Sequence, residues 1–245
     1  MRLPAFLTSI VAVALCSTQS AQAQFQRHVR HYNHQGRPYY AGPLRLTLGG
    51  GTALYNGDLG NSPGDAFLGP ALSLGVLYRL TPHLHLGSEF SYVEVGARDQ
   101  LKERGLAFVS TNGLGTVFFR FDLLSDESVF AASQADAPVF QVFVQGGAGL
   151  LLYNPRSYFG TTKAGTDANF LPTERNDYPA LAGVAPVGGG IGVLLTEKLR
   201  ANLEANYYFT TTDQFDDVSS LRLGEASKSN DGFGTVMLKL EYSLR

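Results

Sequence analysis

The chain has 245 residues, of which 44% are hydrophobic and 11% aromatic, and its formal net charge at pH 7 is −2. A charge balance this close to neutral gives no case for binding nucleic acid, which requires a basic surface. The single cysteine, Cys16, lies in the first residues, so the rest of the chain has no thiol for disulfides, thiol catalysis or cysteine-ligated metals.

The N-terminus has the pattern of a secretory signal peptide. Arg2 supplies a positive charge, Leu3–Cys16 is apolar, and Ala21–Ala23 is a small-residue cleavage motif before Gln24. The apolar run is too short to cross a bilayer as a helix, which disfavours the alternative of a membrane anchor. We therefore expect residues 1–23 to be removed. Cleavage removes one cation, so the charge of the mature chain becomes 18 − 21 = −3.

Residues 24–43 are basic, rich in histidine and without a regular pattern. We expect them to form a flexible segment on the periplasmic side of an outer membrane. His28, His31 and His34 are evenly spaced, and three imidazoles can bind a transition metal. Neither cysteine nor carboxylate side chains lie near them in the sequence, so we expect a cationic arm without a metal.

From residue 44 onward, apolar and polar residues alternate in eight segments, which is the period of β-strands. In Leu199–Phe209, for example, Leu203 and Ala205 fall on one face and Glu204 and Asn206 on the other. The predicted strands are Leu44–Tyr55, Leu68–Arg79, Leu84–Val95, Ala107–Phe121, Val139–Tyr153, Val184–Leu195, Leu199–Phe209 and Phe233–Leu244.

The connections between these strands indicate how they are arranged. Leu80–Tyr92 resembles Leu195–Tyr207, and each copy contains a tight turn followed by a strand with a glutamate on its polar face. The short turns Thr81–His83 and Thr196–Lys198 alternate with long connections, as in membrane barrels with short periplasmic turns and long external loops. We predict an all-β fold, an eight-stranded antiparallel up-and-down transmembrane β-barrel over residues 44–245.

The polar face of the predicted strands carries charges of both signs. Eight strands enclose an interior that side chains fill, so these charges can pair inside a narrow barrel while the apolar face contacts lipid. An Arg or Lys on the lipid face at mid-depth would cost about 2–4 kcal/mol. The alternative is a periplasmic β-sandwich with solvated charged faces. The predicted interior charges are Arg79, Glu89, Arg200, Glu204, Lys239 and Glu241.

Several segments together carry a resemblance to a known family. They are Tyr55–Leu59, Tyr78–Leu84, Gly146–Pro155, the acidic loop Thr212–Ser219, and Ser229–Asp231 before the last strand. On these segments the chain is similar to the Bacteroidota outer-membrane β-barrel family that includes the PorG-like proteins, over nearly the whole mature chain. The resemblance implies an OmpA- or OmpX-like eight-stranded barrel in the outer membrane, and some relatives are accessory parts of type nine secretion and gliding.

Two groups of carboxylates are candidates for chemistry. Asp213, Asp216 and Asp217 offer hard oxygen ligands that could hold Ca²⁺, but Asp also orders turns through backbone N–H groups, and we expect the second role. Glu89 and Glu204 occupy equivalent repeat positions, and paired carboxylates can perform acid–base catalysis. In a filled barrel we expect these glutamates to pair instead with the interior cations Arg79, Arg200 or Lys239.

The sequence does not predict an enzyme or a cofactor. All five histidines lie in the leader or near a predicted periplasmic turn, and no G-x-S-x-G motif occurs. Two functions remain open. In both, we expect the protein to be surrounded by the lipid of the outer membrane. One is a structural or accessory scaffold for envelope or secretion-machinery proteins, serving type nine secretion or envelope integrity. The other is a surface receptor or adhesin that binds ligands through Ala97–Arg104, Arg156–Asp177 and Thr210–Asp231.

Overall fold

The computed structural model describes residues 31–32, 38–39, 44–57, 64–99, 105–124, 126, 138–164, 168–173, 175–196, 198–212, 214–217 and 231–244. The expected signal peptide lies outside these residues. Within the predicted N-terminal segment, β1 (His31–Tyr32) pairs antiparallel with β2 (Pro38–Tyr39). The chain divides into the units Met1–Tyr40 and Ala41–Arg245, and all long strands belong to the second unit.

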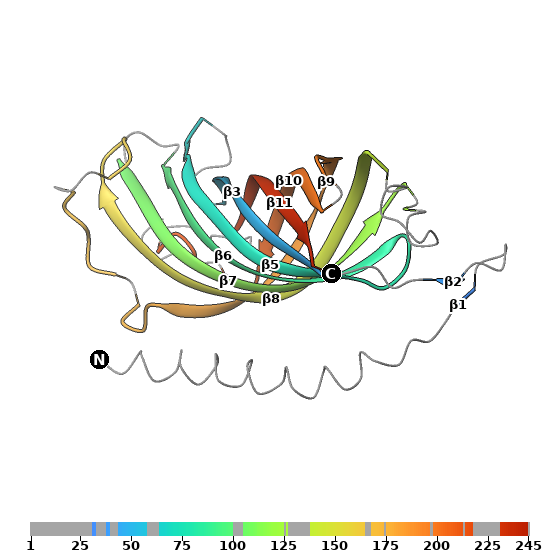
Figure 1. Ribbon diagram of the computed structural model, residues 1–245. Helices are drawn as coiled ribbons and strands as arrows, with labels where there is room; N and C mark the ends of the chain where they lie inside the picture. Colours follow the sequence, from blue (N-terminus) through green and yellow to red (C-terminus); the bar gives the residue numbers. More distant parts are fainter. Residues whose placement is uncertain are drawn as a thin grey trace. The chain divides into compact units, whose positions relative to one another are not determined.

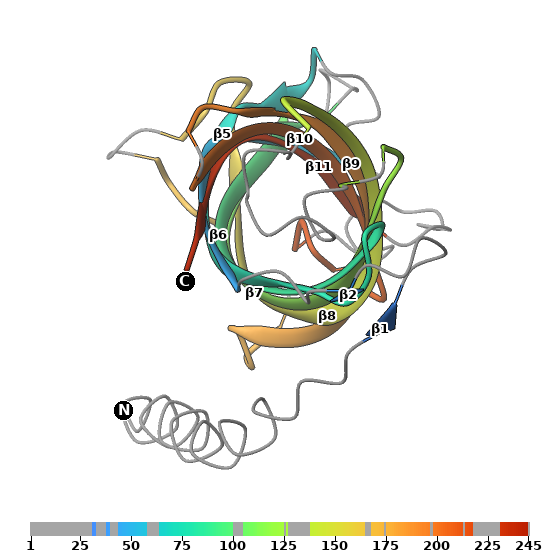
Figure 2. The ribbon, with the colours of Figure 1, turned by 45° about the vertical axis from the view of Figure 1, so that its right-hand side comes forward.

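Eight long strands form a closed antiparallel barrel in the part of the chain that the structure describes (Figures 1 and 2). Each pairs with its neighbours in sequence, and the ring closes because β11 pairs with β3, with Ser243 opposite Arg45 and Val236 opposite Thr52. The predicted eight-stranded antiparallel barrel is therefore confirmed. The strands are β3 (Arg45–Asn56), β5 (Gly69–Arg79), β6 (Leu84–Arg98), β7 (Leu106–Asp122), β8 (Phe140–Phe159), β9 (Ala180–Leu194), β10 (Leu199–Thr210) and β11 (Gly232–Ser243).

The strand bounds differ from the prediction mainly at one end of the barrel. β8 continues to Phe159, past Pro155, where we expected a loop to begin. Its pairing with β9 ends at Tyr153, so beyond that residue β8 lies at an edge, where proline is tolerated. β9 begins at Ala180 rather than Val184, because Ala180–Gly183 has no polar residue on either face and so no alternation to detect. A short strand, β4 (Ala66–Phe67), pairs with the C-terminal part of β6, with Ala66 opposite Ala97.

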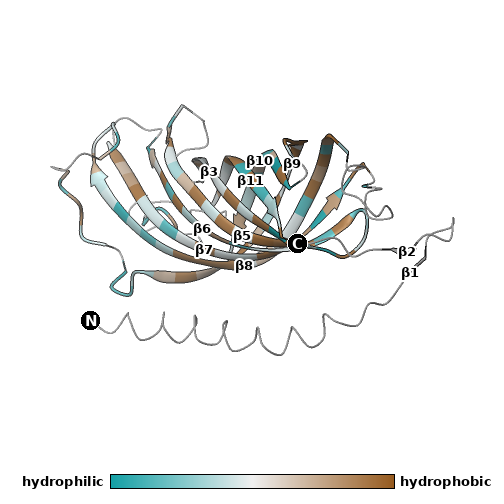
Figure 3. Ribbon diagram, in the orientation of Figure 1, coloured by the Kyte–Doolittle hydropathy of each residue, from teal (hydrophilic) through white to brown (hydrophobic). Residues whose placement is uncertain are grey.

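The two faces of the barrel wall follow the predicted alternation. Hydrophobic and hydrophilic positions alternate along the strands in Figure 3. Outward-facing apolar side chains are exposed around the whole ring, and inward-facing ones are buried. No helix with the length and hydropathy needed to cross a bilayer occurs among the described residues. The outward set includes Leu48, Leu72, Leu74, Phe90, Val117, Phe119, Leu150, Leu152, Val187, Ile191, Leu203, Phe209, Val236, Leu238 and Leu240.

We name the two ends of the barrel by their connections. The turn end holds the tight turns between β5 and β6 and between β9 and β10. The start of the first long strand, β3, and the end of the last strand, β11, also lie there. The loop end holds the connections between β3 and β5, β6 and β7, β8 and β9, and β10 and β11. This division matters because the interior changes character from one end to the other.

Candidate functional site

The half of the interior nearest the turn end is filled with buried charges, most of which form ion pairs. Each of these side chains is less than a tenth exposed, and cations and carboxylates are present in equal number among the described residues. The cations are Arg45, Arg79, Arg120, Arg200 and Lys239, and the carboxylates are Glu89, Asp122, Asp126, Glu204 and Glu241. Burial of an ion is tolerated when it is paired and hydrogen-bonded, so this half of the barrel is a closed ionic layer.

Lys239 on β11 joins the two glutamates of the repeat. Its Nζ lies 2.5 Å from Glu89 Oε2 and 2.8 Å from Glu204 Oε2. Gly49 lies opposite Lys239 on β3, and a Cβ at Gly49 would come within 2.6 Å of Lys239 Cγ and 2.5 Å of Ser73 Oγ. The glycine therefore provides the space that the lysine stem occupies.

Arg120 on β7 is the second centre of the ionic layer, and the sequence prediction did not include it. Its Nη2 donates to Glu204 Oε1 at 2.5 Å, and its Nη1 pairs with Glu241. Its guanidinium also lies 4.0 Å from the ring centroid of Phe143. Arg120 falls between outward Phe119 and Phe121, so the alternation that located the strand could have placed this side chain inside.

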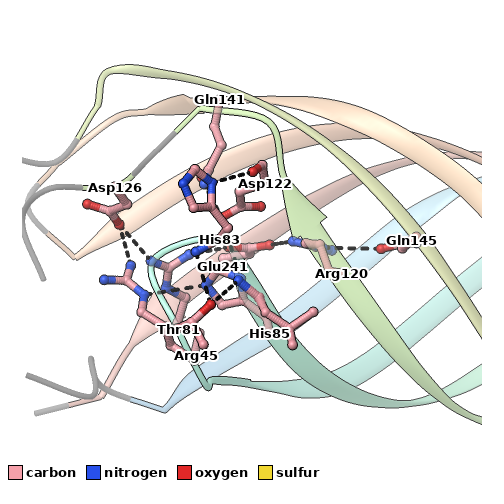
Figure 4. A network of polar contacts seen from close by, with 12 residues as sticks. Arg45, Thr81, His83, His85, Arg120, Asp122, Asp126, Gln141, Gln145 and Glu241 are labelled. Carbon is pink, nitrogen blue, oxygen red and sulfur yellow. Dashed lines mark hydrogen bonds and ion pairs between the residues drawn. The ribbon is translucent and has the colours of Figure 1, made fainter. Parts of the chain in front are cut away.

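Near the turn end, the remaining predicted charges have other partners. Figure 4 shows the surrounding network, in which Arg45 lies between Asp126 and Glu241. Arg79 pairs with Asp126, and Arg45 Nη2 lies 3.6 Å from the same carboxylate. Asp126 belongs to the connection between β7 and β8 and is fully buried, so that connection contributes to closing the barrel. Arg200 donates through Nη2 to the carbonyl of Pro138 at 3.1 Å. Neither Arg79 nor Arg200 pairs with the repeat glutamates, and Arg45 and Asp126 were missed.

Two histidines lie at this end, as the sequence places them. His85 is buried with Nδ1 3.4 Å from Asp122 Oδ2, and His83 Nδ1 lies 2.9 Å from the carbonyl oxygen of Asp122. The ring of His83 stacks on Phe121 with centroids 5.6 Å apart. Each contact is to a wall residue, so both rings help to pack the turn end.

The half of the interior nearest the loop end is mainly apolar and aromatic instead, although Asp216, Asp217 and Asp231 are also buried there. Phe215 comes from the connection between β10 and β11, yet it is fully buried, with its ring 5.5 Å from Phe233 and 6.1 Å from Tyr55. The connection therefore inserts a side chain into the barrel and closes the interior at the loop end. The surrounding core includes Ala53, Val93, Val95, Phe108, Leu114, Leu151, Tyr153, Val184, Tyr208 and Met237.

The acidic residues of this connection accept hydrogen bonds. Tyr55 Oη lies 3.0 Å from Asp216 Oδ2, and Asp217 Oδ2 accepts from Ser157 Oγ at 3.2 Å. Asp217 has φ = 58°, a left-handed conformation that Asp adopts more readily than most residues. Asp213 lies outside the described residues, as do the side chains of His28, His31 and His34. The described part of the chain has no group of three or more His, Cys, Asp or Glu placed to hold a metal ion.

A small polar cluster covers the inserted connection at the loop end. Arg175 pairs with Asp177, and its Nη1 donates to Gln214 Oε1 at 3.1 Å. Tyr178 Oη donates to the carbonyl of Gln214 at 3.3 Å. The hydrogen bond from Arg175 lowers the pKa of Asp177, and burial raises the pKa of Tyr178. These contacts tie the connection between β8 and β9 to the connection that carries Phe215.

Comparison with known proteins gives likenesses of fold alone. No protein-family model and no curated protein sequence matches the chain. Among solved structures, Neisserial surface protein A is 11% identical with a TM-score of 0.45, covering 82% of this chain and 97% of that one. A major outer membrane protein of Thermus thermophilus is also 11% identical with a TM-score of 0.45, covering 82% and 99%.

The outer membrane enzyme PagL is 12% identical with a TM-score of 0.35, covering 81% of this chain and 99% of that one. The expectation that this chain is not an enzyme stays a prediction. The resemblance to PorG-like proteins also stays a prediction. The similar structures are outer-membrane barrels, and the chain shares with them the closed eight-stranded architecture.

Proposed function

We propose that this chain is an outer-membrane protein that serves as a closed structural or accessory scaffold. The observation that carries the proposal is the opposite character of the two wall faces. Outward apolar side chains are strongly exposed, for example Phe90 at 69% and Leu48 at 61%, and they continue around the ring. Soluble monomers rarely expose contiguous apolar surface on this scale, so a lipid surrounding accounts for it.

The filled interior favours a scaffold over a channel. At the centre of the ionic layer, Lys239 bridges two glutamates. In the half nearest the loop end, Phe215 packs between aromatic rings of the barrel wall. Eight strands enclose an interior that side chains can fill, so we expect no water-filled path through it. The protein then acts through its outer surface and its connections.

Heat-modifiable gel migration of the membrane fraction tests the membrane location. A folded membrane barrel kept in detergent without boiling migrates differently from the boiled protein, and it sediments with the outer membrane. Recovery of the chain from the soluble periplasm, with no change of migration on boiling, would contradict the proposal.

The finer role we propose is that of an accessory to envelope or secretion machinery, as the PorG-like resemblance implies. Pull-down from detergent extracts of the native organism should recover secretion or envelope proteins. A deletion strain with normal secretion, gliding and envelope integrity would remove the scaffold role while leaving the membrane location intact.

A second candidate function, ligand binding at the loop end, has one observation in its favour. At the loop end, β8 continues past its pairing with β9, and the Phe159 side chain at its last residue is 67% exposed. An exposed aromatic side chain outside lipid is a common anchor for a partner. Pull-downs with the chain and with Phe159→Ser distinguish the two: partners lost only with the variant favour ligand binding by this end.

A further inference from the structure

One buried hydroxyl group at the loop end lies between two carboxyl groups. Tyr55 Oη lies 2.5 Å from Asp231 Oδ1 and 3.0 Å from Asp216 Oδ2. Each of these three side chains is 3% exposed or less. Tyr55 belongs to β3, whereas Asp216 and Asp231 belong to the connection between β10 and β11. The hydroxyl therefore holds this connection against the barrel wall at two points.

The two contacts of the Tyr55 hydroxyl require an additional proton. A phenol carries one hydrogen and donates it to one acceptor at a time, whereas an ionised carboxylate can only accept. If Asp216 and Asp231 were both ionised, one of the contacts would place a carboxylate oxygen against a lone pair of Tyr55 Oη. Both contacts are attractive only when one carboxyl group is protonated and donates to the phenol oxygen, while the phenol donates to the other. Further partners of the two carboxyl groups do not change this count, because they supply no hydrogen between these oxygen atoms.

The surroundings of the hydroxyl favour the protonated form. The Tyr55 ring centroid lies 4.7 Å from that of Phe108 and 6.1 Å from that of Phe215. A Cβ at Gly57 would lie 2.2 Å from Tyr55 Oη and 2.1 Å from Asp231 Oδ1, so the backbone covers the group closely on that side. Two carboxyl groups that share one buried site do not both ionise readily, because each negative charge disfavours the other.

Other titratable and charged groups face this part of the interior from the surrounding elements. Asp217 accepts from Ser157 Oγ, and Arg175 pairs with Asp177, so neither lies between Tyr55 and its two carboxyl groups. Among the described residues, the groups are Asp217 from the same connection, Tyr153 from β8, Tyr208 from β10, and Arg175 and Tyr178 from the connection between β8 and β9.

We propose that Tyr55, Asp216 and Asp231 hold one shared proton, and that this proton keeps the connection between β10 and β11 closed over the barrel. The closure is complete while the proton is bound, and it is lost as rising pH removes the proton and leaves two carboxylates against one hydroxyl hydrogen. The fold thereby couples closure of the loop end to the proton concentration on that side. The inference does not depend on the proposed membrane location, because these contacts lie inside the barrel.

Infrared spectroscopy of the folded full chain in detergent tests for the shared proton, since a protonated carboxyl group has a carbonyl band that an ionised one lacks. Near neutral pH, we expect difference spectra against Asp216→Asn and against Asp231→Asn to show this band, because either amide supplies the missing hydrogen and the remaining carboxyl group ionises. Asp217→Asn is the matched control, since it is equally buried and asparagine tolerates its φ of 58°. A band that survives in Asp216→Asn or Asp231→Asn, or that is lost in Asp217→Asn, would overturn the shared proton.

Limited proteolysis from mildly acidic to alkaline pH tests the closure, with heat-modifiable migration to verify that the barrel stays folded at each pH. Cleavage of the connection between β10 and β11 should rise several-fold as the infrared band disappears. Asp216→Asn and Asp231→Asn should stay protected throughout, whereas Asp217→Asn should follow the unchanged chain. If cleavage stays constant while the band titrates, or if the band persists at strongly alkaline pH, the proton does not control the closure and the inference fails.

Discussion

The two halves of the barrel interior are closed by different chemistry. Near the turn end, charges from the strands pair across the interior, as when Lys239 holds Glu89 and Glu204. Near the loop end, aromatic rings stack, and one of them, Phe215, comes from a connection. The ionic half depends on each charge keeping its partner. The apolar half depends on side chains filling its volume, and one of these, Phe215, belongs to the connection between β10 and β11 rather than to a strand.

The difference teaches how each half should respond to loss of one side chain. A buried ion that loses its partner keeps its desolvation cost, so the effect spreads through the pairs that share it. A buried aromatic ring that is truncated leaves a cavity, and the surroundings relax in part. The predictions below use these two responses, and they run from the largest expected effect to the smallest.

Replacing Lys239 with methionine should be the most damaging change. Glu89 and Glu204 would stay buried without the cation between them, at a cost of about 3–5 kcal/mol of unfolding free energy. Urea unfolding of the protein in lipid vesicles, followed by gel migration, measures the loss. Adding Glu89→Gln to Lys239→Met should recover part of the stability, and a double variant that is less stable than the single one would show that the pair is not coupled as described.

Replacing Phe215 with alanine should cost about 3 kcal/mol, at the lower end for a buried ring, because the connection can move when its anchor is lost. The same loss should expose the connection between β10 and β11 to protease from the loop side. We expect cleavage there while the barrel keeps its heat-modifiable migration. Planar-bilayer recordings should still show no conductance, because the ionic half stays closed, and a steady open channel would contradict the two-layer closure.

Replacing Tyr55 with phenylalanine separates the hydroxyl from the ring. The ring contacts with Phe108 and Phe215 are kept, but Asp216 and Asp231 lose the donor they share. The expected cost is about 1–3 kcal/mol, from carboxylates left with one hydrogen bond fewer. Protease sensitivity of the connection should rise less than in Phe215→Ala, and an equal rise would mean that the hydroxyl, rather than the inserted ring, holds the connection.

The smallest effect we predict compares two neighbouring glycines of β3. Alanine at Gly49 would meet the Lys239 stem and Ser73, whereas alanine at Gly50 faces outward with its nearest contact 3.7 Å away at Leu72. Gly49→Ala should cost about 1 kcal/mol, the lower end for overpacking, because the lysine stem can adjust. Gly50→Ala is the matched control and should leave urea unfolding unchanged; equal effects at both positions would rule out packing against Lys239 as the cause.

The alternation in the sequence was sufficient to predict the strands and their faces. All eight strands lie where the pattern placed them, and outward residues such as Leu72 and Leu238 are exposed. Where alternation was absent, as in Ala180–Gly183, the strand start was placed too late. Where an edge permitted a proline, as at Pro155, the strand end was placed too early.

The partners inside the barrel were only partly predictable. Lys239 was among the cations expected near Glu89 and Glu204, but Arg120 and Asp126 were not named as partners of any interior charge. Arg120 carried the alternation signal and could have been included. Asp126 and Phe215 lie in connections, where no periodic pattern reports which side chains turn inward.

By itself, the sequence determined that the chain has eight strands with one apolar and one polar face, because a period of two is a local property of the backbone. Only the tertiary structure decided which charges meet, since Glu89 and Lys239 lie far apart in the chain and meet only when β11 closes on β3. It also decided that Phe215 closes the half of the interior nearest the loop end, and that the apolar outer surface reaches the turns at the turn end. Barrel closure sets these contacts across the interior, and no local pattern encodes them.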